Sequence, residues 1–280
     1  MSLSLSPAHL RRYRDVVALL IKYGRGDLVK DSPIVDDPLP HAPAPAVPAE
    51  AAELAADLEK LGPTFVKLGQ LLSTRADLVP ATYLEALARL QDNVEPFSFH
   101  EVEAIVAVEI GARISKAFQE FEPTPFAAAS LGQVHRAILR SGQAVVVKVQ
   151  RPGVREVVAD DLDALAEVAA VLDAHTAAGQ RFQFANIVEE LRKSLLRELD
   201  YRLEAANLRL MREKLTDFDL LLIPAPIDDY STGRVLTMEE VSGKKITKLS
   251  ALRLLEIDGP ALAEEHGAAR GFRRHAPAAL

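Results

Sequence analysis

The sequence has no cysteine among its 280 residues, which excludes disulfides and any metal site or catalytic mechanism that depends on a thiolate. Basic residues are too few for a nucleic-acid-binding surface, because 33 Lys and Arg stand against 40 Asp and Glu and the net charge is −7. No apolar run approaches the ~20 residues that a membrane-spanning helix needs, and residues 1–7 lack the apolar stretch of a secretory signal. With 49% hydrophobic and 26% charged residues, the chain is predicted to fold as one or two globular domains on the cytoplasmic side.

A predicted β-hairpin carries one lysine in an otherwise apolar strand. Strand-forming residues around Val134 and Leu139 lead to a tight turn at residues 141–143, and the strand Ala144–Val149 follows. Lys148 is the charged residue of that strand, so its ammonium must either extend past the sheet edge or meet an anion. In kinases the lysine of a Val-Ala-Ile-Lys strand binds the α- and β-phosphates and a helix glutamate. The alternative is a solvent-facing lysine on an amphipathic strand.

The loop before the hairpin is rich in alanine. Where a protein kinase has a glycine-rich loop over the phosphates, this chain has Phe126, Ala127, Ala128, Ala129 and Ser130. Methyl groups narrow the allowed backbone angles and keep such a loop farther from a ligand, whereas the serine hydroxyl can still donate to a phosphate. The alternative is a helix start or a packed turn.

Three motifs together give the chain a family resemblance. Leu61–Gln70 contains Lys-x-Gly-Gln, Ala127–Ser130 is the alanine-rich loop with Lys148 after it, and Arg197–Asn207 contains Glu-x-Asp. In this order and spacing they resemble the UbiB family of atypical kinases, the aarF-domain-containing kinase-like proteins linked to isoprenoid quinone biosynthesis. The resemblance spans roughly Tyr13 to Glu265.

The resemblance implies an α+β fold, in which a protein-kinase-like N-lobe is preceded by an N-terminal helical extension that lies over the nucleotide site. It implies binding of ATP or ADP with Mg²⁺ by the alanine-rich loop, Lys148 and a hinge at Arg234–Gly243, where Glu239 and Val241 would contact the nucleotide. Lys67 and Gln70 would project from a helix into the place of a protein substrate. The alternative for Lys67 is the solvated side of a helix whose apolar residues face the core.

The acidic residues Glu198, Asp200 and Glu204 lie within two helical turns, where only part of this charge can face solvent at once. We expect one of them to bind Lys148, as the helix glutamate of kinases does, and another to hold Lys67. Spacing does not assign the partners. The alternative is an exposed face stabilised by weak ion pairs along the helix.

The second half of a kinase site is missing from the sequence as given. A catalytic-loop Asp and Asn and the Asp of a DFG motif should follow the hinge, but the roughly 40 residues after it contain no Asn and are too few for a complete helical lobe. Asp258 reads as a turn former, and Asp217–Asp219 precedes the hinge, so neither is taken as catalytic. We therefore expect a largely missing C-lobe, no catalytic residue, no metal-ligating residue, and a disordered tail at 266–280 that arises from a truncation or frameshift.

The N-terminus is predicted to form a basic amphipathic helix at His9–Lys22, which suits contact with the inner face of an anionic membrane. The alternative is a helix that packs on the fold with a solvated basic face. A Pro- and Ala-rich linker follows. The predicted organisation is an N-terminal helix (1–30), the linker (31–48), a helical extension (49–115), the N-lobe (116–243), the start of the C-lobe (244–265) and the tail (266–280).

Periodicity and cap residues predict the remaining elements. Predicted helices lie at 49–61, 63–75, 80–91, 98–110, 154–175 and 184–215, with Ser98 and Glu101 as a capping box. Strands at 118–122, 220–223 and 234–241 join the hairpin in an antiparallel sheet of about five strands. The predicted function is a UbiB-type nucleotide-binding kinase or ATPase, catalytically incomplete as written, with quinone-biosynthesis proteins as partners. The alternative is a non-enzymatic, membrane-associated module that uses the kinase lobe for binding.

Overall fold

The structure, a computed structural model, describes residues 7–23, 49–90, 94–218 and 221–243, without the side chains of residues 7–10. The predicted linker at 31–48, the start of the C-lobe at 244–265 and the tail at 266–280 lie outside these described residues. The chain divides into two compact units. Each unit is described by itself below.

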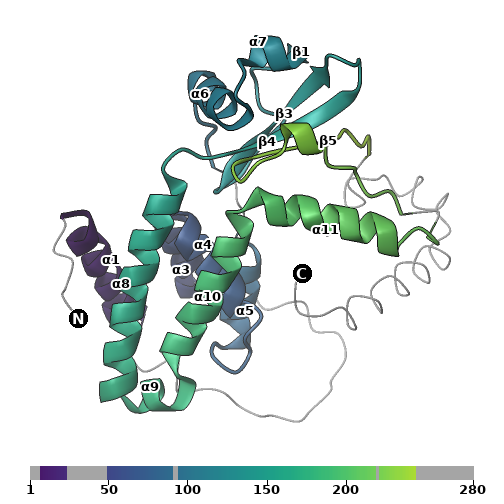
Figure 1. The fold of residues 1–280 in the computed structure, drawn as a ribbon. Helices are drawn as coiled ribbons and strands as arrows, with labels where there is room; N and C mark the ends of the chain where they lie inside the picture. The colour runs from purple at the N-terminus through teal and green to yellow at the C-terminus, as the bar shows by residue number, and fades with distance from the viewer. Residues whose placement is uncertain (1–6, 24–48, 91–93, 219–220, 244–280) are drawn as a thin grey trace. The chain divides into compact units, whose positions relative to one another are not determined.

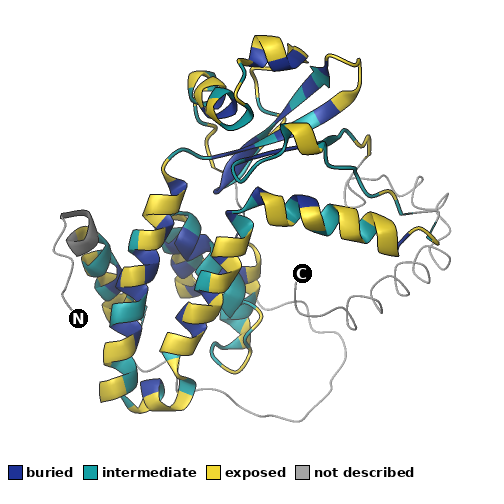
Figure 2. Ribbon diagram, in the orientation of Figure 1, coloured by how far each residue is buried: buried dark blue, intermediate teal, exposed yellow. Residues whose placement is uncertain are grey.

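The first unit is helical and comprises Met1–Glu95, Ala128–Leu131 and Arg151–Leu199. Its helices are labelled in Figure 1: α1 (Pro7–Tyr23), α3 (Ala49–Leu61), α4 (Pro63–Leu72), α5 (Ala81–Ala88), α8 (Val154–His175), α9 (Ala177–Phe182) and α10 (Phe184–Glu198). Buried Leu, Val and Phe side chains from α1, α3, α4, α8 and α10 form one core, so α8 and α10 show a buried stripe on one side and an exposed surface on the other (Figure 2). The predicted helices at 49–61 and 154–175 are confirmed at both ends.

The helix α4, which carries the Lys-x-Gly-Gln motif, begins at a sharp break in the chain. Gly62 adopts φ 107°, a conformation that L-residues with a side chain rarely take. Pro63 follows at the first helical position, where its fixed φ suits a helix and its missing N–H leaves no unsatisfied donor. These two residues end α3 and start α4 in a new direction.

The predicted continuous helix at 184–215 is wrong. The chain instead forms α10 and a separate helix α11 (Tyr201–Lys214), which belongs to the second unit. Asp200 has non-helical angles, φ −112° and ψ 95°, and its side chain accepts a hydrogen bond from the backbone N–H of Arg202 at 3.1 Å. A carboxylate satisfying a free N–H of the first turn is an N-cap, which starts a new helix rather than extending the old one.

The second unit contains the sheet and comprises Pro96–Ala127, Gly132–Gln150 and Asp200–Leu280. The strands are β1 (Phe118–Phe121), β2 (Ala127–Ala128), β3 (Gly132–Leu139), β4 (Ala144–Gln150) and β5 (Val235–Glu239). They form a five-stranded sheet in the order β1-β3-β4-β5, with β2 paired to β3, and the β1, β3, β4 and β5 pairings are antiparallel. The predicted α+β class and the five-stranded antiparallel sheet are confirmed.

The predicted strand at 220–223 is wrong within its described part, residues 221–223, and β2 takes the fifth place instead. Pro224 and Pro226 have no N–H to give to a strand ladder. Beside β5 the chain makes only an isolated bridge from Pro226 to Met238, flanked by backbone hydrogen bonds from Glu239 N–H to the Ala225 carbonyl and from Ile227 N–H to the Thr237 carbonyl. This segment lies along the outer edge of β5 without becoming a strand.

The two faces of β4 are covered differently. Val145, Val147 and Val149 are fully buried in a core that includes α6 (Phe99–Ile110) and β1. The intervening Val146 and Lys148 point to the opposite face, because side chains alternate along a strand. A smaller buried cluster, made by Tyr201 and Ala205 of α11 and Leu236 of β5, packs on that second face.

The connections of the second unit follow familiar cap chemistry. Ser98 and Glu101 form the predicted capping box at the start of α6, and Gly111 ends this helix in the left-handed conformation. A short helix α7 (Ile114–Ala117) leads into β1, and a single 3-10 turn η1 (Asp228–Tyr230) precedes β5. Gly142, with φ 86°, makes the hairpin turn between β3 and β4.

Candidate functional site

The lysine of β4 lies beside an acidic residue of α11. Lys148 Nζ is 2.7 Å from Glu204 Oε2, and the two side chains are 30% and 39% exposed. Of the acids between positions 198 and 204, the structure therefore assigns Glu204 to Lys148. The ammonium is held at one carboxylate and keeps a solvent-accessible side, so a phosphate could still approach it.

The ammonium of this lysine also contacts the face of an aromatic ring. Lys148 Nζ lies 4.7 Å from the ring centroid of Tyr201, a distance at which a cation is attracted to the ring face. Tyr201 is only 1% exposed and belongs to the cluster with Leu236 on the same sheet face. A Cβ added to Gly132 would lie 2.6 Å from the Tyr201 hydroxyl oxygen, so this ring is packed directly against the strand backbone. Sequence reasoning assigned no role to Tyr201, although this residue stands between Asp200 and Arg202 in the Glu-x-Asp segment.

The motif lysine of α4 pairs with the other glutamate. Lys67 Nζ is 2.8 Å from Glu198 Oε2, near the end of α10, and the two side chains are 20% and 38% exposed. Gln70 does not join this pair; its side-chain amide donates to the Leu90 carbonyl oxygen at 3.4 Å, after the end of α5. Lys67 and Gln70 therefore contact different elements of the first unit.

The glycine of the motif allows close helix packing. A Cβ on Gly69 would lie 2.3 Å from a methyl carbon of Leu90, 3.0 Å from one of Leu58 and 3.3 Å from one of Leu87. The atoms that the glycine approaches belong to leucine side chains. Gly69 thus sets how deeply the core leucines of α3 and α5 reach against α4.

Asp200, the third acid, has a local role. Besides capping α11 it accepts two hydrogen bonds from the Arg202 guanidinium, at 2.8 and 2.7 Å. The Arg202 side chain is 71% exposed. The structure pairs Asp200 with this arginine and pairs the two lysines with the glutamates.

The alanine-rich loop is partly a strand. Ala127 and Ala128 form β2, Ala129 follows it, and Ser130 is 1% exposed. The Ser130 hydroxyl is therefore buried. It can donate to a ligand only if the ligand reaches it or the loop moves, whereas an exposed serine could donate without such a change. Ala127 and Ser130 also fall in different units, so this loop contains one of several points at which the chain passes from one unit to the other.

The predicted hinge, Arg234–Gly243, contains β5 and the residues that follow it. The backbone N–H of Glu239 donates to the Ala225 carbonyl at 2.9 Å, and its carboxylate accepts from the Ala225 N–H at 2.9 Å and from Arg212 at 3.3 Å. Glu240 is paired with Arg136 of β3 at 2.9 Å. Val241 is 43% exposed. The Glu239 N–H is thus already engaged, whereas Val241 and the two residues after it are exposed.

A buried polar network stabilises β3 on the opposite face. His135 is fully buried, its Nδ1 lies 2.8 Å from the Glu122 carbonyl oxygen and its Nε2 lies 3.0 Å from Gln133 Nε2. Nδ1 must donate to the carbonyl, so Nε2 accepts from the amide and the ring is neutral. Burial lowers the pKa of His135, in agreement with that assignment. This network is structural and faces away from Lys148.

In the described part of the chain, no cluster of three or more His, Cys, Asp or Glu side chains could hold a metal ion. No helix within the same residues is both long and apolar enough to cross a bilayer.

The basic amphipathic helix is packed on the first unit. Val16 of α1 is 4% exposed in the core, with Tyr13, Val17 and Leu19 packed against the same cluster. The structure therefore shows the second of the two interpretations of this helix, in which its apolar face meets the fold.

One family model and several known proteins resemble this chain over most of its length. A family model described as the ABC1 atypical kinase-like domain matches residues 89–270. The chain is 44% identical over 206 residues to the "Probable protein kinase UbiB" of Cellvibrio japonicus, which covers 74% of this chain and 37% of that protein. It is 42% identical over 224 residues to "Protein ACTIVITY OF BC1 COMPLEX KINASE 7, chloroplastic" of Arabidopsis thaliana, which covers 80% of this chain and 30% of that protein.

A solved structure shows the same likeness. The Mycobacterium tuberculosis protein Rv3197, determined as a complex with erythromycin, aligns with a TM-score of 0.51 and 31% sequence identity over 71% of this chain and 50% of that one. The chain spans little more than a third of the UbiB relative's length. Its motifs, its kinase-like sheet and these matches lead to one assignment: the chain belongs to the ABC1 atypical kinase-like family, which includes the UbiB proteins.

Proposed function

We propose that this chain binds a nucleotide, Mg-ATP or Mg-ADP, at the face of β4 that carries Lys148. The observation that carries the proposal is the pair between Lys148 and Glu204, at 2.7 Å. In kinases a strand lysine held by a helix glutamate contacts the α- and β-phosphates, and the metal is bound partly by the phosphates themselves. The fit rests on this chain's own donors, since the ammonium of Lys148 is partly exposed and already oriented by one carboxylate.

The remaining predicted contacts complete the proposed site. Ala127, Ala128, Ala129 and Ser130 would cover the phosphates, and the backbone of Val241 beside Glu239 would contact the base. Mg²⁺ supplies charge neutralisation of the phosphates when it is bound. Lys67 with Glu198, together with Gln70, is proposed to govern which acceptor reaches the nucleotide.

The decisive measurement is calorimetric titration of the 280-residue chain with Mg-ATP and Mg-ADP. Lys148→Ala is expected to weaken binding by about tenfold or more, because a charge-assisted contact to phosphate is lost. Lys116→Ala is the matched control, since that lysine is exposed on α7 of the same unit. Binding that is absent in the wild type, or equal in both variants, contradicts the proposal.

We further propose that these 280 residues bind nucleotide without turning it over. The segment after the hinge contains no Asn and no DFG motif, so the metal ligands and the acceptor-orienting Asp of a kinase have no counterpart in it. An ATPase rate in the purified chain that disappears in Lys148→Ala would refute this half of the proposal. The role we propose for the complete family architecture is phosphoryl transfer or ATP hydrolysis in support of isoprenoid quinone biosynthesis, with proteins of that pathway as partners. The UbiB name of its relatives supports this role.

A second candidate function is a non-enzymatic module at the inner face of a membrane. The basic face of α1 favours it, because Arg11 is exposed, the Arg14 side chain is 76% exposed and Ile21 is 60% exposed. Flotation with vesicles of phosphatidylglycerol and phosphatidylethanolamine would compare the full chain with a deletion that begins at Asp27. Equal flotation of the two proteins would eliminate the part assigned to α1.

A further inference from the structure

A buried carboxylate joins three helices of the first unit. Asp161 of α8 is fully buried. Its Oδ2 accepts a hydrogen bond from the Thr64 hydroxyl of α4 at 2.7 Å, and its Oδ1 is 2.7 Å from Arg12 Nε of α1. Burial raises the pKa of Asp161 to about 6, against the opposing effects of the Thr64 hydrogen bond and the Arg12 charge. An ionised group in this position is tolerated only with such partners.

The hydrogen bond lies close to the motif lysine. Thr64 precedes Lys67 by three residues, so the two side chains are neighbours along one side of α4. The first is held by Asp161 of α8 and the second by Glu198 of α10. The short helix α4 is therefore held at two points about one turn apart. These two contacts fix its rotation about its own axis and its position along that axis relative to α8 and α10.

Arg12 links the carboxylate to the start of the motif helix. Its Nη1 donates to the Leu61 carbonyl oxygen at 3.1 Å, at the end of α3 and two residues before Pro63. The same guanidinium thus contacts Asp161 and the junction from which α4 departs. Its side chain is 25% exposed, so it reaches the buried acid from the surface.

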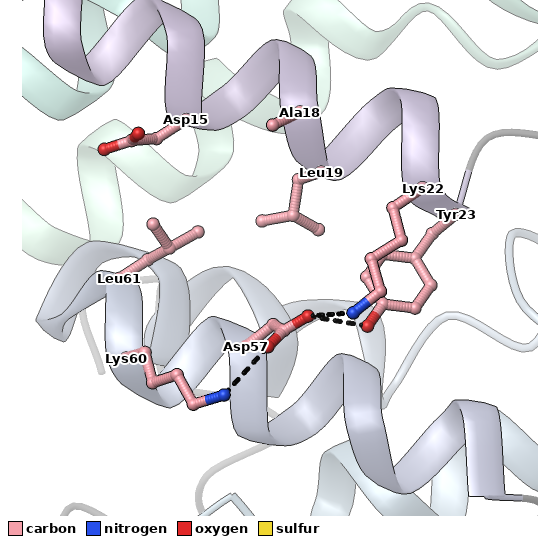
Figure 3. Close-up of a pocket in the computed structure, with 8 residues that line it drawn as sticks. All are labelled: Asp15, Ala18, Leu19, Lys22, Tyr23, Asp57, Lys60 and Leu61. Atoms are coloured by element: carbon pink, nitrogen blue, oxygen red, sulfur yellow. Dashed lines mark hydrogen bonds and ion pairs between the residues drawn. The ribbon is translucent and has the colours of Figure 1, made fainter.

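The other end of α1 is fastened by a second polar cluster. Lys22 Nζ is 2.7 Å from Glu53 and 2.7 Å from Asp57, and the Tyr23 hydroxyl donates to Asp57 at 2.8 Å. Hydrogen bonds from Lys22 and then Tyr23 lower the pKa of Asp57 to about 2. Figure 3 shows the contacts of Asp57 with Lys22 and Tyr23, beside a hollow of about 240 Å³ between α1 and α3. The polar contacts at the two ends of α1 add to the apolar packing of Val16, Tyr13 and Val17 in the core of the first unit.

We propose that Asp161 is a positioning residue for the motif helix α4, and that Arg12 of α1 is the counter-ion that allows it to act. Through Thr64 this carboxylate sets where Lys67 stands relative to Glu198. The N-terminal helix α1 thereby contributes, through Arg12, to the position of Lys67. The inference rests on the proposed function only in treating Lys67 as a functional residue, because the geometry itself involves no nucleotide.

The test is a zero-length carbodiimide cross-link, which condenses a carboxylate with a neighbouring amine to an amide while the carbodiimide takes up the water. Mass spectrometry of the digested full chain would measure the Lys67–Glu198 amide as a ratio to the Lys148–Glu204 amide. The second pair is an internal reference, since it has nearly the same separation, 2.7 against 2.8 Å, and similar exposure, and it lies in the other unit. The assay needs no nucleotide, so it can succeed or fail independently of calorimetry with Mg-ATP.

Matched variants isolate the hydroxyl and the charge. Thr64→Val keeps the side-chain shape without the donor and is expected to lower the ratio by about fivefold, the effect of one buried hydrogen bond on a two-state arrangement. Thr64→Ser keeps the donor and is expected to restore the ratio. Arg12→Gln is expected to lower it, whereas Arg11→Gln, which removes the same charge from an exposed neighbour on α1, is expected to leave it unchanged.

Several results would overturn the proposal. One is a Thr64→Val variant whose ratio of the Lys67–Glu198 amide to the Lys148–Glu204 amide equals that of the wild type. Another is a fall of both amides by the same factor in that variant. Equal effects of Arg11→Gln and Arg12→Gln would also overturn it. Because Arg12 is partly exposed, its variant keeps the test available even if a change at the buried Thr64 prevents folding.

Discussion

Replacing Gly132 with alanine should disturb the support of Lys148 without touching either charged residue. The new Cβ would lie 2.6 Å from the Tyr201 hydroxyl oxygen and 2.6 Å from the Val149 carbonyl oxygen. Both distances are shorter than any real Cβ contact, and the carbonyl belongs to the β4 backbone, which cannot rotate away. Overpacking of this kind costs about 1–3 kcal/mol. We expect the loss to appear in the second unit, where both neighbours lie.

Hydrogen exchange of peptides from β3 and β4 would measure this loss locally, which avoids treating a chain of two units as one cooperative transition. Gly132→Ala is expected to speed exchange there and to weaken Mg-ATP binding, because Tyr201 lies under Lys148. Adding Tyr201→Phe removes one of the two short contacts and should recover about half of the lost free energy. Gly243→Ala is the control, since nothing lies within 4 Å of its Cβ. Unchanged exchange in Gly132→Ala would show that this strand can move away, and the reasoning would fail.

Three further predictions concern stability. Burial lowers the pKa of His135, so its contribution to stability is present above the ordinary value of about 6.5 and is lost as the pH falls through the lowered pKa; the protection of β3 amides, corrected for the intrinsic exchange rate at each pH, should fall at pH 5, and His135→Gln should weaken that dependence. The pKa of Asp161 is raised to about 6, so the first unit should lose up to roughly 3 kcal/mol as the pH rises from about 4 to above 6; a urea titration of Asp161→Asn that kept the same pH slope would contradict this. Ser98→Ala removes the cap of α6 and should cost about 1 kcal/mol by the same titration, whereas Ser115→Ala, on a helix with no side-chain cap, should change little.

The sheet and the lysine strand could be predicted because their signals are local. A run of valines and a glycine turn define the hairpin, and Lys148 interrupts the apolar run at a position that faces away from the main core. The capping box of α6 was equally readable, since Ser98 and Glu101 lie three residues apart. Such features depend on neighbours in the chain, which the sequence displays directly.

The pairing of the two lysines could not be predicted, and the reason is the break at Asp200. If residues 184–215 formed one helix, Glu198 and Glu204 would project from the same rigid rod. The cap at Asp200 instead places Glu198 on α10 and Glu204 on α11, in different units. The break at Asp200 therefore separates the two glutamates, and each lysine pairs with the glutamate of its own unit.

Asp161 was overlooked for a related reason. It follows Asp160 in a long amphipathic helix, where two acids in a row are usually solvated. Its burial depends on Thr64, 97 positions earlier in the chain, and on Arg12 at a still greater separation. Contacts this distant in sequence leave no periodic pattern.

The segment around Pro226 also affects how this protein behaves in concentrated solution. It occupies hydrogen-bonding groups of β5 that would otherwise be offered to a second molecule. Because proline has no N–H, the segment cannot itself recruit another strand, so growth of the sheet from one molecule to the next stops at this border. Substituting both Pro224 and Pro226 by valine should therefore favour self-association through the sheet.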